Sequence, residues 1–260
     1  MTLRLTRLPS PLLLGFASIF GGLVLWSAVV YSGLLSSKLV PSPFELLAQA
    51  ISLLSGGYVS TSLYAHVAAS LARTLVGFTI AVLVGVPLGL LIGRMRTLEA
   101  LFFPWFAFLR PIPAIAFVPL VILWFGIGEF SKIAVIFFSS FLYITVNTMA
   151  AVKGVPEQLL RAGSSLGAKR RKLFLYVIFP AALPQILSGI RIGSAISWTL
   201  VVAAELVAAQ VGLGYMIMDA ATFFRVKDVY VGLIAIGIIG FLLETTIAFV
   251  EQKVVHWHGK

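Results

Sequence analysis

Apolar residues gather in six long stretches along the chain, with polar and charged residues between them. Each stretch has about 20 residues or more, which is the length that an α-helix needs to cross the hydrocarbon core of a bilayer. The stretches cover about residues 12–31, 71–93, 101–125, 133–152, 183–206 and 229–250. The alternation typical of a membrane β-barrel is missing, and a chain in lipid must pair its own backbone groups. The pattern therefore predicts an all-α integral membrane protein with about six transmembrane helices.

The composition agrees with a membrane protein. Hydrophobic residues make up 60% of the sequence, charged residues 11%, and the mean hydropathy is +1.06, whereas soluble domains carry about 25% charged residues. Six spans use most of the 260 residues, so we expect a single transmembrane domain over residues 1–260 and no large domain outside the membrane. The sequence contains no cysteine, which excludes disulfides and thiolate sites.

The net charge of +10 bears on orientation. The basic residues lie in short clusters between the apolar stretches, so we expect membrane lipid and no nucleic acid as their surroundings. Lys and Arg favour the cytoplasmic side of short loops. Both termini are therefore expected in the cytoplasm, on the side of Arg4, Arg7, Arg94, Arg96, Lys153, Arg161 and residues 169–172. The first stretch lacks the short apolar core and the cleavage site of a signal peptide, so we expect an uncleaved helix there.

Two of the connecting segments have helical patterns of their own. In the first, Ser42-Pro43-Phe44-Glu45 is typical of a helix start, with a hydroxyl N-cap, proline at the first helical position and a glutamate that can close a capping box. Apolar residues then recur on one face, at Leu46, Leu47, Ala50, Ile51 and Leu54. This helix either lies along the outer membrane surface or packs on neighbouring spans.

The second connecting segment is a loop over residues 155–180, expected on the cytoplasmic side. An apolar stripe at helical spacing predicts a short amphipathic helix, and Gly167 can end that helix in a left-handed turn. The stripe consists of Leu159, Leu160, Ala162, Gly163 and Leu166. Because such a helix exposes apolar side chains to water, it needs a partner that buries them.

This loop resembles the signature of the permease subunits of type I ATP-binding-cassette (ABC) importers. The signature is E-A-A, three residues, glycine, nine residues, and then I-x-L-P. Here Arg161-Ala162-Gly163 takes the place of E-A-A, Gly167 that of the glycine, and Val177-Ile178-Phe179-Pro180 that of the ending. Arg161 stands where the family has an acid and Gly163 where it has alanine, so the polar contact of the family's glutamate is not carried over.

The resemblance covers nearly the whole chain and is closest to the sulfonate, nitrate and bicarbonate branch, and within it to taurine permeases. The matching segments are Leu39-Val40-Pro41-Ser42-Pro43, His66 with Ser70-Leu71 and Arg73, Arg110-Pro111-Ile112-Pro113-Ala114, Trp124-Phe125-Gly126-Ile127-Gly128-Glu129, Gly189-Ile190-Arg191-Ile192-Gly193, Ala203-Ala204-Glu205-Leu206, Gly212-Leu213-Gly214-Tyr215 and Trp257-His258-Gly259. The resemblance implies an importer of a small anion, taurine or another sulfonate, in the bacterial inner membrane. Nitrate and bicarbonate are the alternatives.

The resemblance also implies partners. The coupling helix would seat in a groove on an ATPase, through Glu157, Leu160, Arg161, Ala162, Gly163, Leu166, Gly167 and Pro180. This chain has no phosphate-binding G-x-x-x-x-G-K-[ST] loop, so ATP and Mg would be bound by that partner, and the chain itself needs no cofactor. The implied assembly contains two ATPase subunits, a periplasmic or extracellular solute-binding protein and a second copy of the chain.

Proline and ionisable residues inside the spans are the candidates for the substrate path. Pro104, Pro111, Pro113 and Pro119 interrupt the third stretch, and a break near Arg110 would suit a path, although an interfacial helix followed by a kinked span fits equally. Ionisable residues within spans face a cavity or the bundle interior, which draws attention to Arg191, Glu205 and Glu244. The path candidates are Arg110, Pro111, Pro113, Trp124, Asn147, Trp198 and Glu205.

The sequence gives less support to functions other than transport by an ABC importer. The histidines lack metal-ligand spacing, and no nucleophile lies in a triad pattern, so we expect neither a metal site nor an enzyme. An ion-coupled carrier would need a coupling site at Glu205 or Glu244, and a membrane scaffold would need none. Glycines at four-residue spacing, at Gly85, Gly89, Gly93, Gly189 and Gly193, predict close helix packing.

Overall fold

The computed structural model describes residues 11–34, 36 and 38–255, and within them every regular element is helical. The N-terminal Arg4 and Arg7 and the C-terminal His256, Trp257 and His258 lie outside the described residues. The elements are α1 (Pro11–Tyr31), α2 (Pro43–Gly56), α3 (Leu63–Arg94), α4 (Arg96–Leu109), η1 (Ala114–Ala116), α5 (Phe117–Phe125), α6 (Glu129–Lys153), α7 (Glu157–Ser165), α8 (Arg170–Leu173), η2 (Phe174–Ile178), α9 (Phe179–Ala208), α10 (Leu213–Thr222) and α11 (Val226–Val254).

Among the described residues, five helical stretches are long and apolar enough to cross a membrane. They include α1, α3, α6, the run from α8 to α9, and α11. A sixth crossing is possible because α4 and the η1–α5 pair pass the same test together, with a bend of 85° between them. The expected all-α architecture with about six spans is confirmed.

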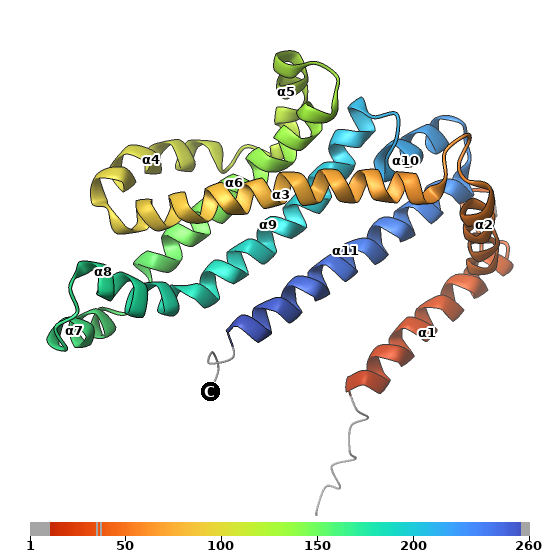
Figure 1. Ribbon diagram of the computed structural model, residues 1–260. Coiled ribbons are helices and arrows are strands. Elements are labelled where there is room, and N and C mark those ends of the chain that lie inside the picture. The colour runs from red at the N-terminus through yellow and green to blue at the C-terminus, as the bar shows by residue number, and fades with distance from the viewer. Residues whose placement is uncertain (1–10, 35, 37, 256–260) are drawn as a thin grey trace, which may run out of the picture.

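The break in the third apolar stretch lies where the prolines predict it. Helix α4 ends at Leu109, and η1 begins only at Ala114. Pro111 and Pro113 have no backbone N–H to donate, so a continuous helix cannot run through them. Figure 1 shows the consequence, with α4 folded back beside α3 and α5 pointing away from the bundle.

Helices α3, α6 and α9 form the centre of the bundle (Figure 1), and glycines let them approach closely. A Cβ atom on Gly89 of α3 would lie 2.6 Å from the backbone oxygen of Thr145 on α6. A Cβ on Gly193 of α9 would lie 2.7 Å from the Ile144 side chain, also on α6. These contacts confirm the close packing that the glycine spacing predicts.

Helix α2 begins with the predicted capping box. The Glu45 backbone N–H donates to the Ser42 hydroxyl at 3.3 Å, and the Ser42 backbone N–H donates to the Glu45 carboxylate at 3.0 Å. On its apolar face Leu46 is buried, whereas Leu47, Ile51 and Leu54 are exposed.

The buried side of α2 packs on the start of α11, at the end of the bundle opposite α7 (Figure 1). There Gln49 donates to Asp228 at 2.6 Å, and Lys227 pairs with Glu45 at 3.1 Å. Of the two interpretations of this segment, the contacts support packing on neighbouring spans.

Candidate functional site: an end helix and a cavity between spans

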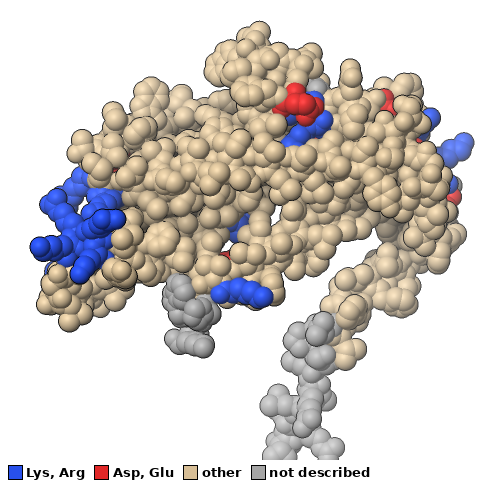
Figure 2. Space-filling view, viewed as in Figure 1, with Lys and Arg blue, Asp and Glu red and all other residues tan. Residues whose placement is uncertain are grey.

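Helix α7 protrudes at one end of the molecule, followed by the basic helix α8 (Figure 1). Figure 2 shows Lys and Arg side chains gathered at this end, where the chain carries Lys169, Arg170, Arg171 and Lys172. Gly167 follows α7 with φ of +80°, and the Ala168 N–H donates to the Gly163 oxygen at 3.1 Å. The predicted left-handed turn at Gly167 is therefore confirmed.

The apolar stripe of α7 is divided between two environments. Leu166 is 89% exposed, and Leu159 and Ala162 are also exposed. Leu160 is half-buried against Val155 and its neighbours in the chain's own core. Because α7 packs against the α8–η2 segment, the side of α7 that faces this segment is not available to a partner.

Gly163 is a correction to the expected docking residues. It is buried, and a Cβ atom there would lie 2.7 Å from Cδ1 of Leu173 and 3.0 Å from Cγ2 of Val177. Glycine at this position of the signature thus permits a close contact between α7 and the α8–η2 segment. Of the predicted anchors, Gly163 faces its own chain, whereas Leu160 is half-buried and its contact with a partner stays a prediction.

The polar residues of α7 pair on the helix surface. Nη2 of Arg161 lies 2.9 Å from Oε1 of Glu157, one turn earlier, and both side chains are exposed. A surface pair of this kind contributes about 0.3–0.5 kcal/mol. Arg161 thus has a partner within α7, although the family signature places an acid there.

A π-helical segment joins α8 to α9. The segment η2 spans Phe174–Ile178, and Pro180 is the second residue of α9, which follows it. Proline removes one backbone donor, and short π-helical turns occur as local irregularities within long helices. The helical run therefore continues from the basic helix α8, beside α7, through η2 into α9.

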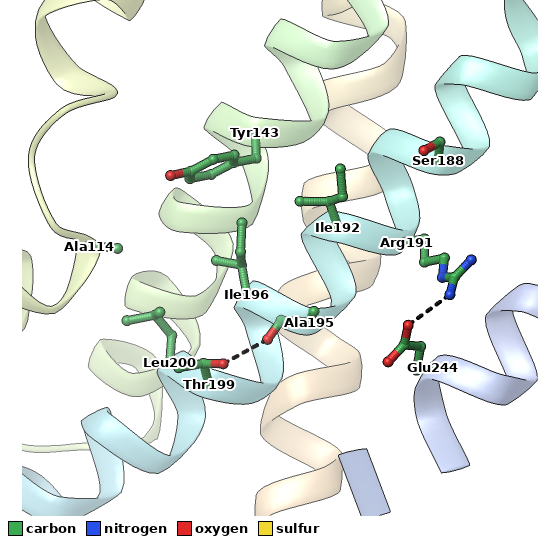
Figure 3. Close-up of a pocket in the computed structure, with 10 residues that line it drawn as sticks. All are labelled: Ala114, Tyr143, Ser188, Arg191, Ile192, Ala195, Ile196, Thr199, Leu200 and Glu244. Atoms are coloured by element: carbon green, nitrogen blue, oxygen red, sulfur yellow. Dashed lines mark hydrogen bonds and ion pairs between the residues drawn. The ribbon is translucent and has the colours of Figure 1, made fainter. Parts of the chain in front are cut away.

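A cavity of about 570 Å³ lies between the spans (Figure 3). Its polar lining residues are Tyr143 of α6, Ser188, Arg191 and Thr199 of α9, and Glu244 of α11. In Figure 3, Arg191 and Glu244 point toward each other, and Nη2 of Arg191 lies 2.8 Å from Oε1 of Glu244. The remaining lining residues are apolar and are Ala114, Ile192, Ala195, Ile196 and Leu200.

Arg191 is the one basic side chain among the residues that line this cavity, and it is paired with Glu244. A guanidinium group recognises planar or tetrahedral oxyanions through a fork of N–H donors, and Arg191 keeps 43% of its side chain exposed despite the ion pair. The hydroxyl of Thr199 donates to the Ala195 oxygen at 3.0 Å. Sequence reasoning placed Arg191 and Glu244 among the ionisable span residues but did not name them as path residues.

The predicted path residues do not come together in one site. Arg110 and Asn147 line a separate narrow hollow between α4 and α6, and Asn147 donates to the Tyr143 oxygen at 2.8 Å. Pro111 and Pro113 are exposed at the break, just before Ala114 of the cavity wall.

The two predicted tryptophans also differ in position. Trp124 is exposed at the end of α5, where its ring meets Phe125. Trp198 is buried and donates from Nε1 to the Ile236 oxygen at 3.0 Å. Trp198 also lines a smaller hollow, of about 200 Å³, beside Arg191 and Glu244.

Glu205 is the clearest correction to the predicted path. Its side chain is fully buried, and its carboxylate accepts hydrogen bonds from Ser70 at 2.9 Å, Arg73 at 2.6 Å and the Gly214 N–H at 2.9 Å. A carboxylate enclosed in this way faces no cavity. Its role in the fold is to tie α9 and α10 to α3.

The partners of Glu205 were not predicted as functional residues. Ser70 and Arg73 belong to the same stripe of α3 as His66, whose Nδ1 lies 3.0 Å from the Gly212 oxygen. The signal was present in the sequence, because polar residues at positions 66, 70 and 73 share one face of an otherwise apolar helix.

Comparisons with known proteins identify the family to which this chain belongs. The family model described as binding-protein-dependent transport system inner membrane component matches residues 85–256. Taurine transport system permease protein TauC of Escherichia coli (strain K12) is 38% identical over 239 residues, which are 92% of this chain and 87% of the relative. Nitrate import permease protein NrtB of Synechocystis sp. is 36% identical over 238 residues, 90% of this chain and 86% of the relative.

A solved structure supports the fold. A chain of the MetNI methionine ABC transporter in an inward-facing conformation superposes with a TM-score of 0.63 at 21% identity, over 74% of this chain and 95% of that one. The resemblance drawn from the sequence motifs is confirmed, and the relatives are transport permeases. The chain therefore belongs to the family of binding-protein-dependent transport system inner membrane components, the multi-pass permeases of ABC importers.

Proposed function

We propose that this chain is the non-catalytic permease subunit of an importer that carries a small anion, taurine or another sulfonate, across the inner membrane. The observation that carries the proposal is α7, an amphipathic helix that protrudes from the end of the bundle with Leu166 89% exposed. A protruding apolar side chain costs free energy in water, about 25 cal/mol for each Å². A partner docked on α7 would bury Leu166 and remove this unfavourable free energy.

The partner that fits α7 is an ATPase subunit that binds ATP and Mg in place of this chain. Helix-in-groove docking uses the exposed face of a short helix, which here carries Leu159, Ala162 and Leu166. Because α7 packs against η2, and η2 continues into α9, a movement of the docked helix would reach the cavity wall through α9. The chemical energy would come from the partner.

Orientation follows from charge. The basic residues at the α7 end favour the cytoplasm, as Figure 2 illustrates for the Lys and Arg side chains at that end. Six crossings would then place both termini on the cytoplasmic side. The opposite end, with α2 and α10, would face the periplasmic or extracellular solute-binding protein.

The assembly proposed is a homodimer with two ATPase subunits. Each copy of the chain supplies one α7, and ATPases of this class act as a closing pair, so two docking helices are needed. Arg191 and Glu244 in the cavity wall stay partly exposed, and a second copy would complete the path between the two chains.

The proposed substrate class rests on the relatives and on Arg191. The similar permeases are named for taurine and for nitrate, both of which carry a negatively charged oxyanion group. Arg191 supplies the matching positive charge in the cavity. Taurine or another sulfonate is proposed because the taurine permease shows the higher identity of the two, with nitrate or bicarbonate as the alternative.

An ion-coupled carrier is less well supported by the geometry. Such a carrier needs an intramembrane carboxylate that can exchange a proton or sodium ion. Glu205 is enclosed by three donors, and Glu244 is paired with Arg191. The protruding α7 would also have no role in that mechanism.

Reconstitution in liposomes tests the proposal. The purified chain, its ATPase and the solute-binding protein are combined with taurine, and ATP hydrolysis and uptake are measured together. We expect hydrolysis to rise when the binding protein and taurine are both present. Uptake driven by an ion gradient without the ATPase, or hydrolysis that ignores both additions, would contradict the proposal.

A variant at the α7 turn sharpens this experiment. Gly167→Val places a β-branched residue at φ of +80°, which costs about 1–3 kcal/mol of backbone strain and favours another turn. We expect hydrolysis to continue while uptake for each ATP falls severalfold. Gly167→Asn is the matched control, because asparagine tolerates the left-handed region and should keep most of the coupling.

A further inference from the structure

A second charged cluster lies at the end of the bundle opposite α7. It joins Arg73 of α3, Glu129 and Lys132 at the start of α6, and Glu205 near the end of α9. A cavity of about 450 Å³ opens beside it, lined by Arg73, Ile127, Gly128, Glu129, Lys132, Gln210 and Val211. This cavity shares no lining residue with the cavity at Arg191.

The two acids in the cluster are held differently. The Glu205 carboxylate is fully buried and also accepts from Ser70 and the Gly214 N–H. The side chain of Glu129 is 61% exposed, and among the described residues its carboxylate meets only the two cations. Glu129 is thus the member that can leave without breaking the fold.

The two cations form a receptor with a defined geometry. Nε and Nη2 of Arg73 donate to the two oxygens of Glu129 at 2.6 and 2.8 Å, and Nζ of Lys132 donates to one of them at 2.8 Å. The side chains of Arg73 and Lys132 are only 7% and 6% exposed. Arg73 keeps Glu205 as a partner, but without Glu129 the buried Lys132 would have no acidic partner among the described residues. A buried cation without a counter-ion is strongly destabilising, so Lys132 needs an anionic group beside it.

We propose that Arg73 and Lys132 form a binding site for a small sulfonate or carboxylate anion, and that Glu129 is its resident, exchangeable occupant. A sulfonate has three oxygens, which can satisfy the arginine fork and the lysine together. When the external anion enters, the Glu129 side chain turns into the solvent beside the cavity. The exchange conserves charge, because one carboxylate leaves as one anion arrives.

The site does not depend on transport. It uses side chains of a single copy, and its ligand is defined by charge and shape, so it can be tested without the ATPase or the solute-binding protein. A tethered carboxylate competes with a free anion at an effective concentration of the order of millimolar or more. The wild-type chain should therefore bind free anions weakly, and removal of the Glu129 charge should reveal the site.

The test measures the thermal unfolding temperature of the full chain in lipid nanodiscs while ethanesulfonate replaces chloride at constant ionic strength. We expect Glu129→Gln to unfold at a lower temperature than the wild type without ethanesulfonate and to recover with saturating ethanesulfonate. The apparent dissociation constant should be on the order of tenfold lower than in the wild type. Adding Lys132→Gln to Glu129→Gln should abolish the recovery.

A matched control removes a different cation at the same end. Lys227 pairs with Glu45 on the surface, so Lys227→Gln in the Glu129→Gln background should leave the ethanesulfonate response intact. Glu129→Asp, which keeps the charge but shortens the reach, gives a second test if the glutamine variant does not fold, and it should bind more tightly than the wild type. Equal responses in wild type and both Glu129 variants, or a response that survives Lys132→Gln, would overturn the proposal.

Discussion

Charged side chains at two places in the bundle form ion pairs with oppositely charged partners. Arg73 bridges Glu129 and Glu205, and Arg191 meets Glu244. Removing a charge from water costs several kcal/mol unless a partner and hydrogen bonds compensate. The two groups differ in how far they are enclosed, because Arg73 and Glu205 are buried while Arg191 and Glu244 stay partly exposed in their cavity.

The capping box of α2 should give that helix a dependence on pH. The backbone N–H of Ser42 and the nearby Lys227 lower the pKa of the Glu45 carboxyl. A lowered pKa contributes stability above the ordinary pKa of about 4.3, and that contribution is lost as the pH falls through the lowered value. We expect weaker protection against hydrogen exchange, relative to the intrinsic rate, at the start of α2 below about pH 4.

The matched variant for this prediction is Glu45→Gln. Its amide oxygen can still accept from the Ser42 N–H, but it carries no charge to titrate. We expect the exchange rate of α2 in the variant to lack the acid-dependent change that the wild type shows, after correction for intrinsic exchange. Equal pH dependence in both proteins would mean that Glu45 is not the group responsible.

Single residues could be predicted from the sequence where the contact is local. Ser42, Glu45 and Gly167 have partners within a few positions, so their roles follow from the residue types. The partners of Glu205 lie on α3, 132 and 135 positions away along the chain. That contact depends on which spans are neighbours, which the hydrophobic pattern does not specify.

At the scale of helices, the apolar stretches of the sequence predicted where the spans lie but not where each helix begins and ends. The expected second span begins at residue 71, whereas α3 begins at Leu63 because the Ser62 hydroxyl accepts from the Ala65 N–H at 3.2 Å. The polar residues of the first turns are buried against other helices. A hydropathy pattern cannot detect a helix turn whose polar side chains are paired within the fold.

The α3–α6 contact should be sensitive to a single methyl group. Gly89→Ala places Cβ 2.6 Å from both the Thr145 backbone oxygen and the Thr148 Cβ, so the helices must move apart. Overpacking of this kind costs about 1–3 kcal/mol. We expect a lower unfolding temperature in nanodiscs.

Gly22 of α1 supplies the control for this contact, because a Cβ there meets nothing within 4 Å. Gly22→Ala should leave the unfolding temperature unchanged or raise it slightly, since alanine favours helices by about 0.5–1 kcal/mol over glycine. An equal loss in the two variants would show that the effect is not specific to the α3–α6 contact.

At the scale of the molecule, the proposed ATPase-docking helix and the proposed anion site at Arg73 lie at opposite ends of the bundle. Helix α7 and the basic residues lie at one end, the Arg73 cluster lies toward the other, and α9 runs between them (Figure 1). In the proposed transport cycle, the partner's ATP hydrolysis acts on α7, and α9 carries the movement to the cavity at Arg191. This coupling requires α7 to be accessible from the cytoplasm and covered by the ATPase.

Cysteine labelling at Leu166 tests this coupling most directly. The chain contains no cysteine, so Leu166→Cys provides a single thiol, and Leu47→Cys on the exposed side of α2 provides the control at the opposite end. In vesicles with the cytoplasmic face outward, a membrane-impermeant maleimide should label position 166 and not position 47, and bound ATPase should protect position 166 several-fold. Labelling of position 166 from the other face only, or labelling that bound ATPase does not reduce, would contradict the proposed coupling through α7.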